Sequence, residues 1–169
     1  MALYTIWNGP APTTAAQVPV TTGTVIKTLL QVATSATKPA KIVAWGISFD
    51  GFAALLPIRC ELLETDIAAT VTAHVTAGIV RTDGEAIAGG DPVTNLLPVG
   101  TAATGYTASA EGAIGSSRVF DAQLVAPTNQ YVYQFPLGRE PILAVSKFGR
   151  IRVTAGTAVN AYCFIVVEV

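Results

Sequence analysis

Histidine is the scarcest of the residues in this chain that could do chemistry. His74 is the only one among 169 residues, so a Ser–His–Asp or Cys–His arrangement would have to use it. It lies in a Thr- and Ala-rich stretch with no nucleophile signature around it. We therefore expect His74 to be a neutral structural side chain, and the sequence argues against a hydrolase.

The two cysteines, Cys60 and Cys163, lie far apart, and no secretion signal precedes them. This usage does not indicate a disulfide scaffold, and free cysteine packs as a small hydrophobic residue. We expect two reduced thiols in the core, although a bridge stays possible if their strands are neighbours. One histidine and two distant cysteines also do not make a usual structural zinc site.

The carboxylates offer no better site. Asp83, Glu85 and Asp91 share one Gly-rich loop, but their spacing does not match an EF-hand. Glu61 and Glu64 would lie on opposite faces of one strand, so they are not a glycosidase pair. The glycines form neither a dinucleotide-binding motif nor a Walker A motif. The sequence predicts no enzyme, no metal and no cofactor.

Composition points to a protein that needs partners. Charged residues make up 12% of the chain, about half of the roughly 25% typical of a soluble domain, while apolar residues make up 51%. So few charges leave much of the surface either neutral or covered by another molecule. The net charge is −1 and there is no basic block, which argues against a nucleic-acid partner.

Mean hydropathy is +0.51, yet no stretch reaches the roughly 18 continuous apolar residues of a membrane span. The uncharged segment before Lys27 has no basic start, and prolines and polar residues interrupt it. We expect no membrane partner and synthesis in a cytoplasm.

The sequence predicts that the elements carrying these candidate residues are β-strands. Val43, Trp45, Ile47 and Phe49 alternate with small or polar residues, which is typical of a half-buried strand. Similar alternation marks further segments, at 24–32, 58–65, 119–125, 131–135, 150–154 and 160–169. Residues 66–80 fit either a strand or one helical turn, and the β-branched content of 68–77 favours a strand. Residues 82–104 read as a long surface loop. About eight strands and no helical stripe predict an all-β, antiparallel, jelly-roll-like sandwich.

The first 24 residues form a distinct neutral segment ahead of the domain predicted at 25–169. Two interpretations carry equal weight. Leu3, Tyr4, Ile6 and Trp7 could anchor an extended arm to its own domain or to a neighbour. Alternatively, residues 3–7 form a first strand followed by a loop.

The final strand predicts an interface. Ala161, Cys163, Ile165 and Val167 would face the core, but Tyr162, Phe164 and Val166 make the opposite face apolar too. That face would be covered by the chain's own arm or loops, or by another subunit. Trp45, Tyr131 and Tyr133 are expected in the core, which leaves Trp7 as the one aromatic of this group outside it.

Several runs of sequence resemble small jelly-roll structural proteins of tailed bacteriophages. They are KTLLQVA at 27–33, KIVAWGISFDG at 41–51, ELLETD at 61–66, GYTASAEG at 105–112, FDAQLV at 120–125 and PLGREP at 136–141. The resemblance covers most of the chain beyond about residue 24.

The resemblance implies a capsid decoration (cement) or minor capsid protein. Such a protein would bind the major capsid protein on the outer capsid surface of the virion, as a homo-oligomer and most commonly a trimer. It would be made in the host bacterial cytoplasm. Leu3, Tyr4, Ile6 and Trp7 would bind the capsid, and Tyr162, Phe164 and Val166 would form the oligomer interface. The alternative is a receptor- or carbohydrate-binding head domain of a phage fibre or tail.

Overall fold

The computed structural model describes residues 2–84 and 97–169, which form an all-β molecule. Besides the strands, these residues include the 3-10 turn η1 (Thr76–Gly78). The strands are β1 (Leu3–Trp7), β2 (Val20–Thr21), β3 (Lys27–Ala33), β4 (Ala40–Phe49), β5 (Ile58–Thr65), β6 (Thr70–Ala73), β7 (Ile79–Arg81), β8 (Gly105–Ala110), β9 (Ser117–Val125), β10 (Gln130–Gln134), β11 (Ile142–Leu143), β12 (Phe148–Thr154) and β13 (Asn160–Glu168).

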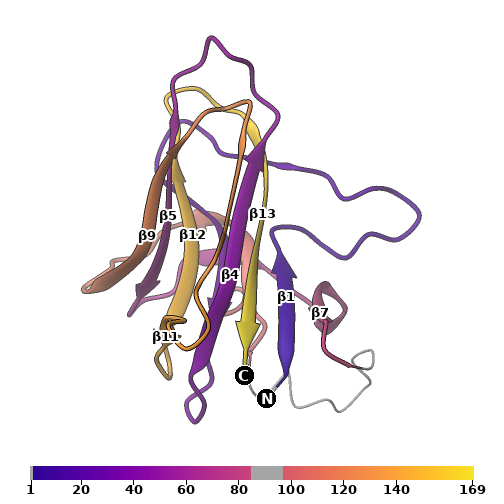
Figure 1. Cartoon of the computed structure of the whole chain (residues 1–169), viewed down its shortest axis with the longest axis vertical. Helices are drawn as coiled ribbons and strands as arrows, with labels where there is room; N and C mark the ends of the chain where they lie inside the picture. The colour runs from indigo at the N-terminus through magenta and orange to yellow at the C-terminus, as the bar shows by residue number, and fades with distance from the viewer. Residues whose placement is uncertain (1, 85–96) are drawn as a thin grey trace.

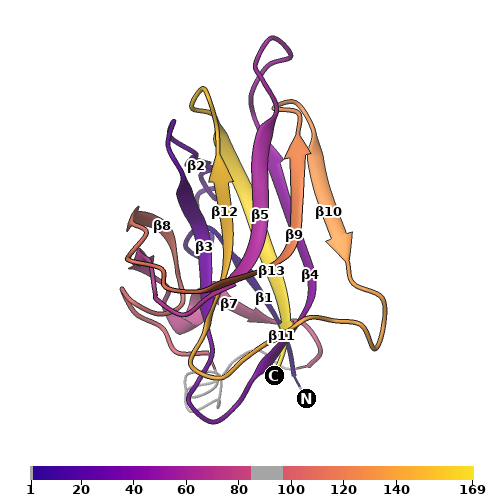
Figure 2. The same ribbon diagram turned by 90° about the vertical axis from the view of Figure 1, so that its left-hand side faces the viewer.

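The strands build two antiparallel sheets that pack face to face (Figure 1, Figure 2). Sheet A has the order β10-β4-β13-β1-β7, with β2 beside β13 and β11 beside β4. Sheet B has the order β6-β8-β3-β12-β5-β9. The antiparallel all-β sandwich predicted from the sequence is confirmed, whereas the jelly-roll order of its strands stays a prediction.

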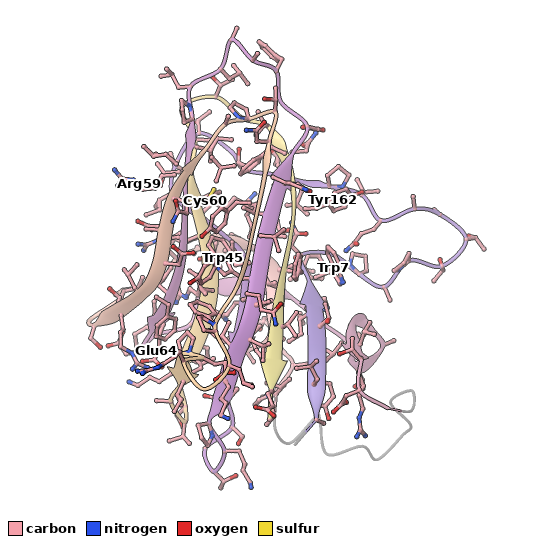
Figure 3. The ribbon with its side chains drawn as sticks, in the orientation of Figure 1. Trp7, Trp45, Arg59, Cys60, Glu64 and Tyr162 are labelled. Carbon is pink, nitrogen blue, oxygen red and sulfur yellow. The ribbon has the colours of Figure 1, made fainter. Side chains whose placement is uncertain are left out.

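The core lies between the sheets and follows from period-two alternation. Along β13, residues alternate between buried and half-buried without interruption, so every second side chain enters the core. Trp45 of β4 is fully buried, and its indole Nε1 donates to Asp121 at 3.1 Å, so the ring's only polar atom is satisfied (Figure 3). Cys60 and Cys163 are both buried in the core as expected, and the structure places them as free cysteines.

The N-terminal segment follows the second of the two interpretations. Residues 3–7 form β1, which pairs with β13 on one side and with β7 on the other. Tyr4 and Ile6 point into the sandwich and are buried. The connection between β1 and β2 leaves the sheets after the buried residues Asn8 and Gly9, as the long loop that projects beside β1 in Figure 1.

The outer side of sheet B is covered at β3 by other segments of the chain. Gln31 points outward from β3 and is buried, and its side-chain amide bonds the backbone of Ala69 and Ala103. The segments around Ala69 and Ala103 therefore cover this part of β3. No apolar pattern in the sequence predicts this cover. The loop predicted at 82–104 lies partly outside the described residues, and Leu97 near its end is buried in the core.

Candidate binding surface

The structure gives His74 a structural place. Its ring is buried against Tyr106, and its Nε2 donates to the carbonyl oxygen of Trp7 at 2.7 Å. Its Nδ1 faces Gly78 so closely that a Cβ atom there would lie 2.5 Å from it. Burial lowers the pKa of His74, although the bond to Trp7 opposes this. A neutral imidazole packed in this way is positioned to hold strands together, not to activate a nucleophile.

The carboxylates are engaged in ion pairs of the fold. Glu61 pairs with Arg152 at 2.8 Å on the outer side of sheet B, whereas Glu64 pairs with Arg118 at 2.9 Å on the other side of β5. Asp83 pairs with Arg81, while Glu85 and Asp91 lie outside the described residues. Within the part of the chain that the structure describes, no three His, Cys, Asp or Glu side chains come together as metal ligands.

The outer side of sheet A is unusual for a sandwich because apolar side chains cross it from strand to strand. Trp7 of β1 pairs with Phe164 of β13, Phe164 pairs with Gly46 of β4, and Gly46 pairs with Val132 of β10. We call the apolar ones among the outward side chains of this sheet the apolar face; they are Trp7, Ala44, Val80, Val132, Tyr162, Phe164 and Val166. The same side of the sheet also carries the polar residues Thr5, Ser48, Gln130 and Gln134.

The centre of the apolar face is packed tightly. The Trp7 and Phe164 rings meet with centroids 4.9 Å apart. The Phe164 ring lies over Gly46, where a Cβ atom would be only 2.5 Å from the ring and 3.1 Å from Val132. Glycine is therefore required here for close approach, since any larger residue would push the ring off the sheet. The result is a continuous apolar stripe across four strands.

Charges appear only where the apolar face ends. The Lys41–Glu168 ion pair, with 3.4 Å between Nζ and Oε2, marks one end, and Asp50, hydrogen-bonded to Asn160, marks the other. Between Asn160 and Glu168, the outward side chains of β13 are the phenol of Tyr162, the ring of Phe164 and the methyl groups of Val166. In a sandwich strand these outward positions normally carry polar residues that face water.

A hollow of about 130 Å³ opens on the apolar face. Its lining includes Trp7, Tyr162, Phe164 and Val132, with Gln130 and Ser48 among the polar residues at its side. Figure 3 shows Trp7 and Tyr162 next to the base of the projecting loop. The Tyr162 hydroxyl donates to the carbonyl oxygen of Gln17 at that base. The hollow thus combines aromatic surface with an amide and hydroxyl groups.

The structure brings some of the predicted site residues together and separates others. Tyr162, Phe164 and Val166 lie on the apolar face as predicted, and Trp7 joins them. Leu3 is half-buried at the rim, but Tyr4 and Ile6 are in the core and are not accessible to a partner.

Sequence reasoning missed three members of the apolar face. They are Ala44, and Val80 and Val132, which are 47% and 57% exposed. Val80 lies at the end of segment 66–80, for which the sequence leaves strand and helical turn both open. Val132 alternates with Tyr131 and Tyr133, which were expected in the core, and its own outward position carried no prediction. The signal that was available is Gly46, because a glycine in the middle of a long strand indicates close approach by a neighbouring group.

A search for similar proteins found no match among protein-family models, curated proteins or solved structures. Residues 2–84 and 97–169 include no helix with the length and hydropathy of a membrane span.

Proposed function

We propose that this chain is a structural subunit of a larger protein assembly, which acts by binding and not by catalysis. The observation that carries the proposal is the apolar face, which leaves tryptophan, phenylalanine and valine side chains at the surface of a chain with few charges. Contiguous apolar surface of this kind is typical of protein interaction sites.

The assembly we propose is the capsid of a tailed bacteriophage, with the chain as a decoration (cement) protein on its outer surface. The support is the sequence resemblance to phage jelly-roll proteins. The partners would be the major capsid protein and further copies of the chain, in a homo-oligomer such as a trimer. Burying apolar area at about 25 cal/mol per Å² would add free energy that an expanding lattice must overcome.

The accessible residues narrow the proposed contacts. Because Tyr4 and Ile6 are buried, the binding residues at the N-terminus reduce to Trp7, with Leu3 at the rim. Phe164 and Val166 continue the same surface, so the capsid contact and the contact between copies would share one face instead of using an arm and a strand separately.

A second candidate function, a receptor- or carbohydrate-binding head domain, is supported by one observation. Tyr131, Tyr133 and Phe135 form an aromatic row along β10, and Tyr133 is 39% exposed. Tyr133 was expected in the core. Asp121 lies beside the row and accepts from the Tyr131 hydroxyl at 2.8 Å. Aromatic rings next to hydrogen-bonding groups are suited to sugar recognition.

The decisive experiment compares two valines that match in exposure but lie on different sheets. Val132 on the apolar face is 57% exposed, and Val119 on the outer side of sheet B is 54% exposed. We expect Val132→Glu to weaken cosedimentation with phage capsids at least tenfold, which corresponds to about 1.4 kcal/mol. Val119→Glu should leave binding unchanged.

Circular dichroism and thermal unfolding would show that both variants fold. Equal binding by the two variants would remove the apolar face from the proposal. Binding of the unmodified chain to glycan arrays, but not to capsids, would favour the head-domain function instead.

A further inference from the structure

The projecting loop and the hollow on the apolar face carry complementary chemistry. The loop connects β1 to β2, and its residues 9–16 read GPAPTTAA, without a charge or a side chain larger than threonine or proline. Pro10 is exposed, and so are all residues from Pro12 to Ala16. Figure 1 shows the loop extending past β1, away from β4.

Both ends of this loop are fixed to the sheet. Asn8 is buried; its Nδ2 donates to the Ala161 carbonyl at 3.0 Å, and its Oδ1 accepts from the Cys163 backbone at 2.9 Å. At the other end, the carbonyl of Gln17 accepts from the Tyr162 hydroxyl. The loop is therefore presented from a defined base, which reduces the entropy lost when its tip is bound.

The hollow offers what a segment with two prolines needs. Proline-rich segments favour the extended polyproline II conformation, whose carbonyl groups stay free, and aromatic-lined grooves recognise such segments. Trp7, Tyr162 and Phe164 supply the aromatic surface, while Gln130 and Ser48 supply donors for carbonyl oxygens. The small residues of the loop can approach the rings without a clash.

We propose that residues 10–16 of one copy dock into the hollow on the apolar face of a second copy. This inference rests on the proposed function, because it names the segment that covers the same face. The second copy is the suitable occupant because a single chain supplies both halves of the contact. Loop and hollow are both uncharged, so neither repulsion between like charges nor the desolvation of a charge opposes their association.

The contact would be heterologous, since the loop of one copy meets a different surface on the next. Repetition of such a contact generates a ring when the rotation between copies closes, or an open filament when it does not. A closed ring would agree with the homo-oligomer expected from the sequence.

Cross-linking between two single-cysteine variants tests the contact directly. We would mix Thr13→Cys, in the loop, with Val132→Cys, at the hollow, and measure the rate at which a mixed disulfide dimer forms. Val119→Cys, on the outer side of sheet B, is the control partner for Thr13→Cys. The native thiols can stay, because both are buried and burial raises the pKa of Cys60 to about 12 and that of Cys163 well above its usual range.

We expect the Thr13→Cys and Val132→Cys pair to cross-link at least tenfold faster than Thr13→Cys with the control. Equal rates for the two pairs would overturn the proposal. Faster cross-linking of Val132→Cys with itself would also overturn it, because it would show that two apolar faces meet directly.

Replacing residues 10–16 by a Gly/Ser segment of equal length separates this inference from the proposed function. Analytical ultracentrifugation should show self-association at least tenfold weaker than in the unmodified chain. If the replacement leaves self-association unchanged while Val132→Glu abolishes it, the apolar face is still the binding surface, but the loop is not what binds to it. A chain that stays monomeric at every concentration refutes the docked loop, and the capsid cosedimentation of Val132→Glu still decides the proposed function.

Discussion

The outer sides of the two sheets differ in the polarity of their side chains and in whether the chain itself covers them. On sheet A, the outward residues of β13 are Tyr162, Phe164 and Val166, and they remain partly exposed. On sheet B, the neighbouring outward positions of β12 are Arg150 and Arg152, and the chain covers Arg150 completely. The outer side is therefore apolar and open at β13, whereas it is charged and closed at Arg150 of β12.

The closed side is held by a buried ion pair. Arg150 donates from Nη1 to the backbone and side chain of Glu111, at 3.0 and 3.3 Å, and from Nη2 to the carbonyl of Ile67. Glu111 in turn accepts from the backbone and hydroxyl groups of Thr28, each at 2.6 Å. Its two carboxylate oxygens therefore tie β3 and β12 to the segment that covers them.

The difference follows from the cost of removing each kind of group from water. A buried charge needs a partner at a fixed distance and angle, so a cover from the same chain, folded once and permanently, is the suitable solution. Apolar groups gain from burial without a required geometry. The apolar face can therefore stay open in the single chain and be covered when a partner arrives.

The largest effect is expected from breaking the buried pair. Glu111→Ala leaves Arg150 buried without its counter-charge, which should lower the free energy of unfolding by about 3 kcal/mol. This value is at the low end for buried pairs, because the Glu111 side chain keeps 20% of its exposure. Urea denaturation measures the change, and self-association of the folded fraction should be retained.

The matched control is the ion pair at the end of the apolar face. Glu168→Gln removes a partner of Lys41 in a pair whose side chains are 40% and 27% exposed, so the loss should stay below about 1 kcal/mol. If the two variants, Glu111→Ala and Glu168→Gln, lost equal amounts of unfolding free energy, the contrast between the covered outer side at β12 and the open outer side of sheet A would be contradicted.

The sequence predicted the parts of this picture that depend on local alternation. The large residues of β4 and the two apolar sides of β13 are visible as period-two patterns, so the sandwich and half of the apolar face were predictable. The sequence interpretation also gave equal weight to a first strand at residues 3–7, which is what β1 is.

The features that could not be predicted from the sequence depend on contacts between segments that lie far apart in the chain. Nothing near Arg150 in the sequence indicates that Glu111, 39 positions away, would be its partner. Likewise, Tyr4 and Ile6 have the same types as exposed anchors, and only the pairing of β1 with both β13 and β7 puts them in the core.

The packing of the apolar face predicts an intermediate effect at Gly46. In Gly46→Ala the added methyl group would clash with the Phe164 ring. We therefore expect the free energy of unfolding to fall by about 2 kcal/mol, which is typical of overpacking. In a Phe164→Ala background the same change should cost at least about 1 kcal/mol less, because the ring is gone. Denaturation of the two single variants and the double variant gives this coupling energy.

One result of this double-mutant comparison would contradict the prediction. If the losses in the free energy of unfolding were additive, the Phe164 ring would not be held over Gly46, and the tight packing described for the centre of the apolar face would be wrong. A coupled result accompanied by weaker self-association of Gly46→Ala would show that the position of the Phe164 ring matters for binding as well as for stability.

The smallest effect concerns acid, and it depends on His74. Because burial lowers the pKa of His74 in the folded chain, the unfolded chain binds the proton more readily, with a pKa of about 6.5. Stability is therefore complete above pH 6.5 and is lost as the pH falls below it toward the folded pKa. Thermal unfolding from pH 7.5 to 5 should show a falling Tm.

His74→Gln is the control, since it removes the titrating group from this window. Asp50, Asp66 and Asp83 cannot produce the slope, because their pKa values are lowered from 3.8 by hydrogen bonds and they act only at more acid pH. The same slope in His74→Gln would exclude His74 as its source.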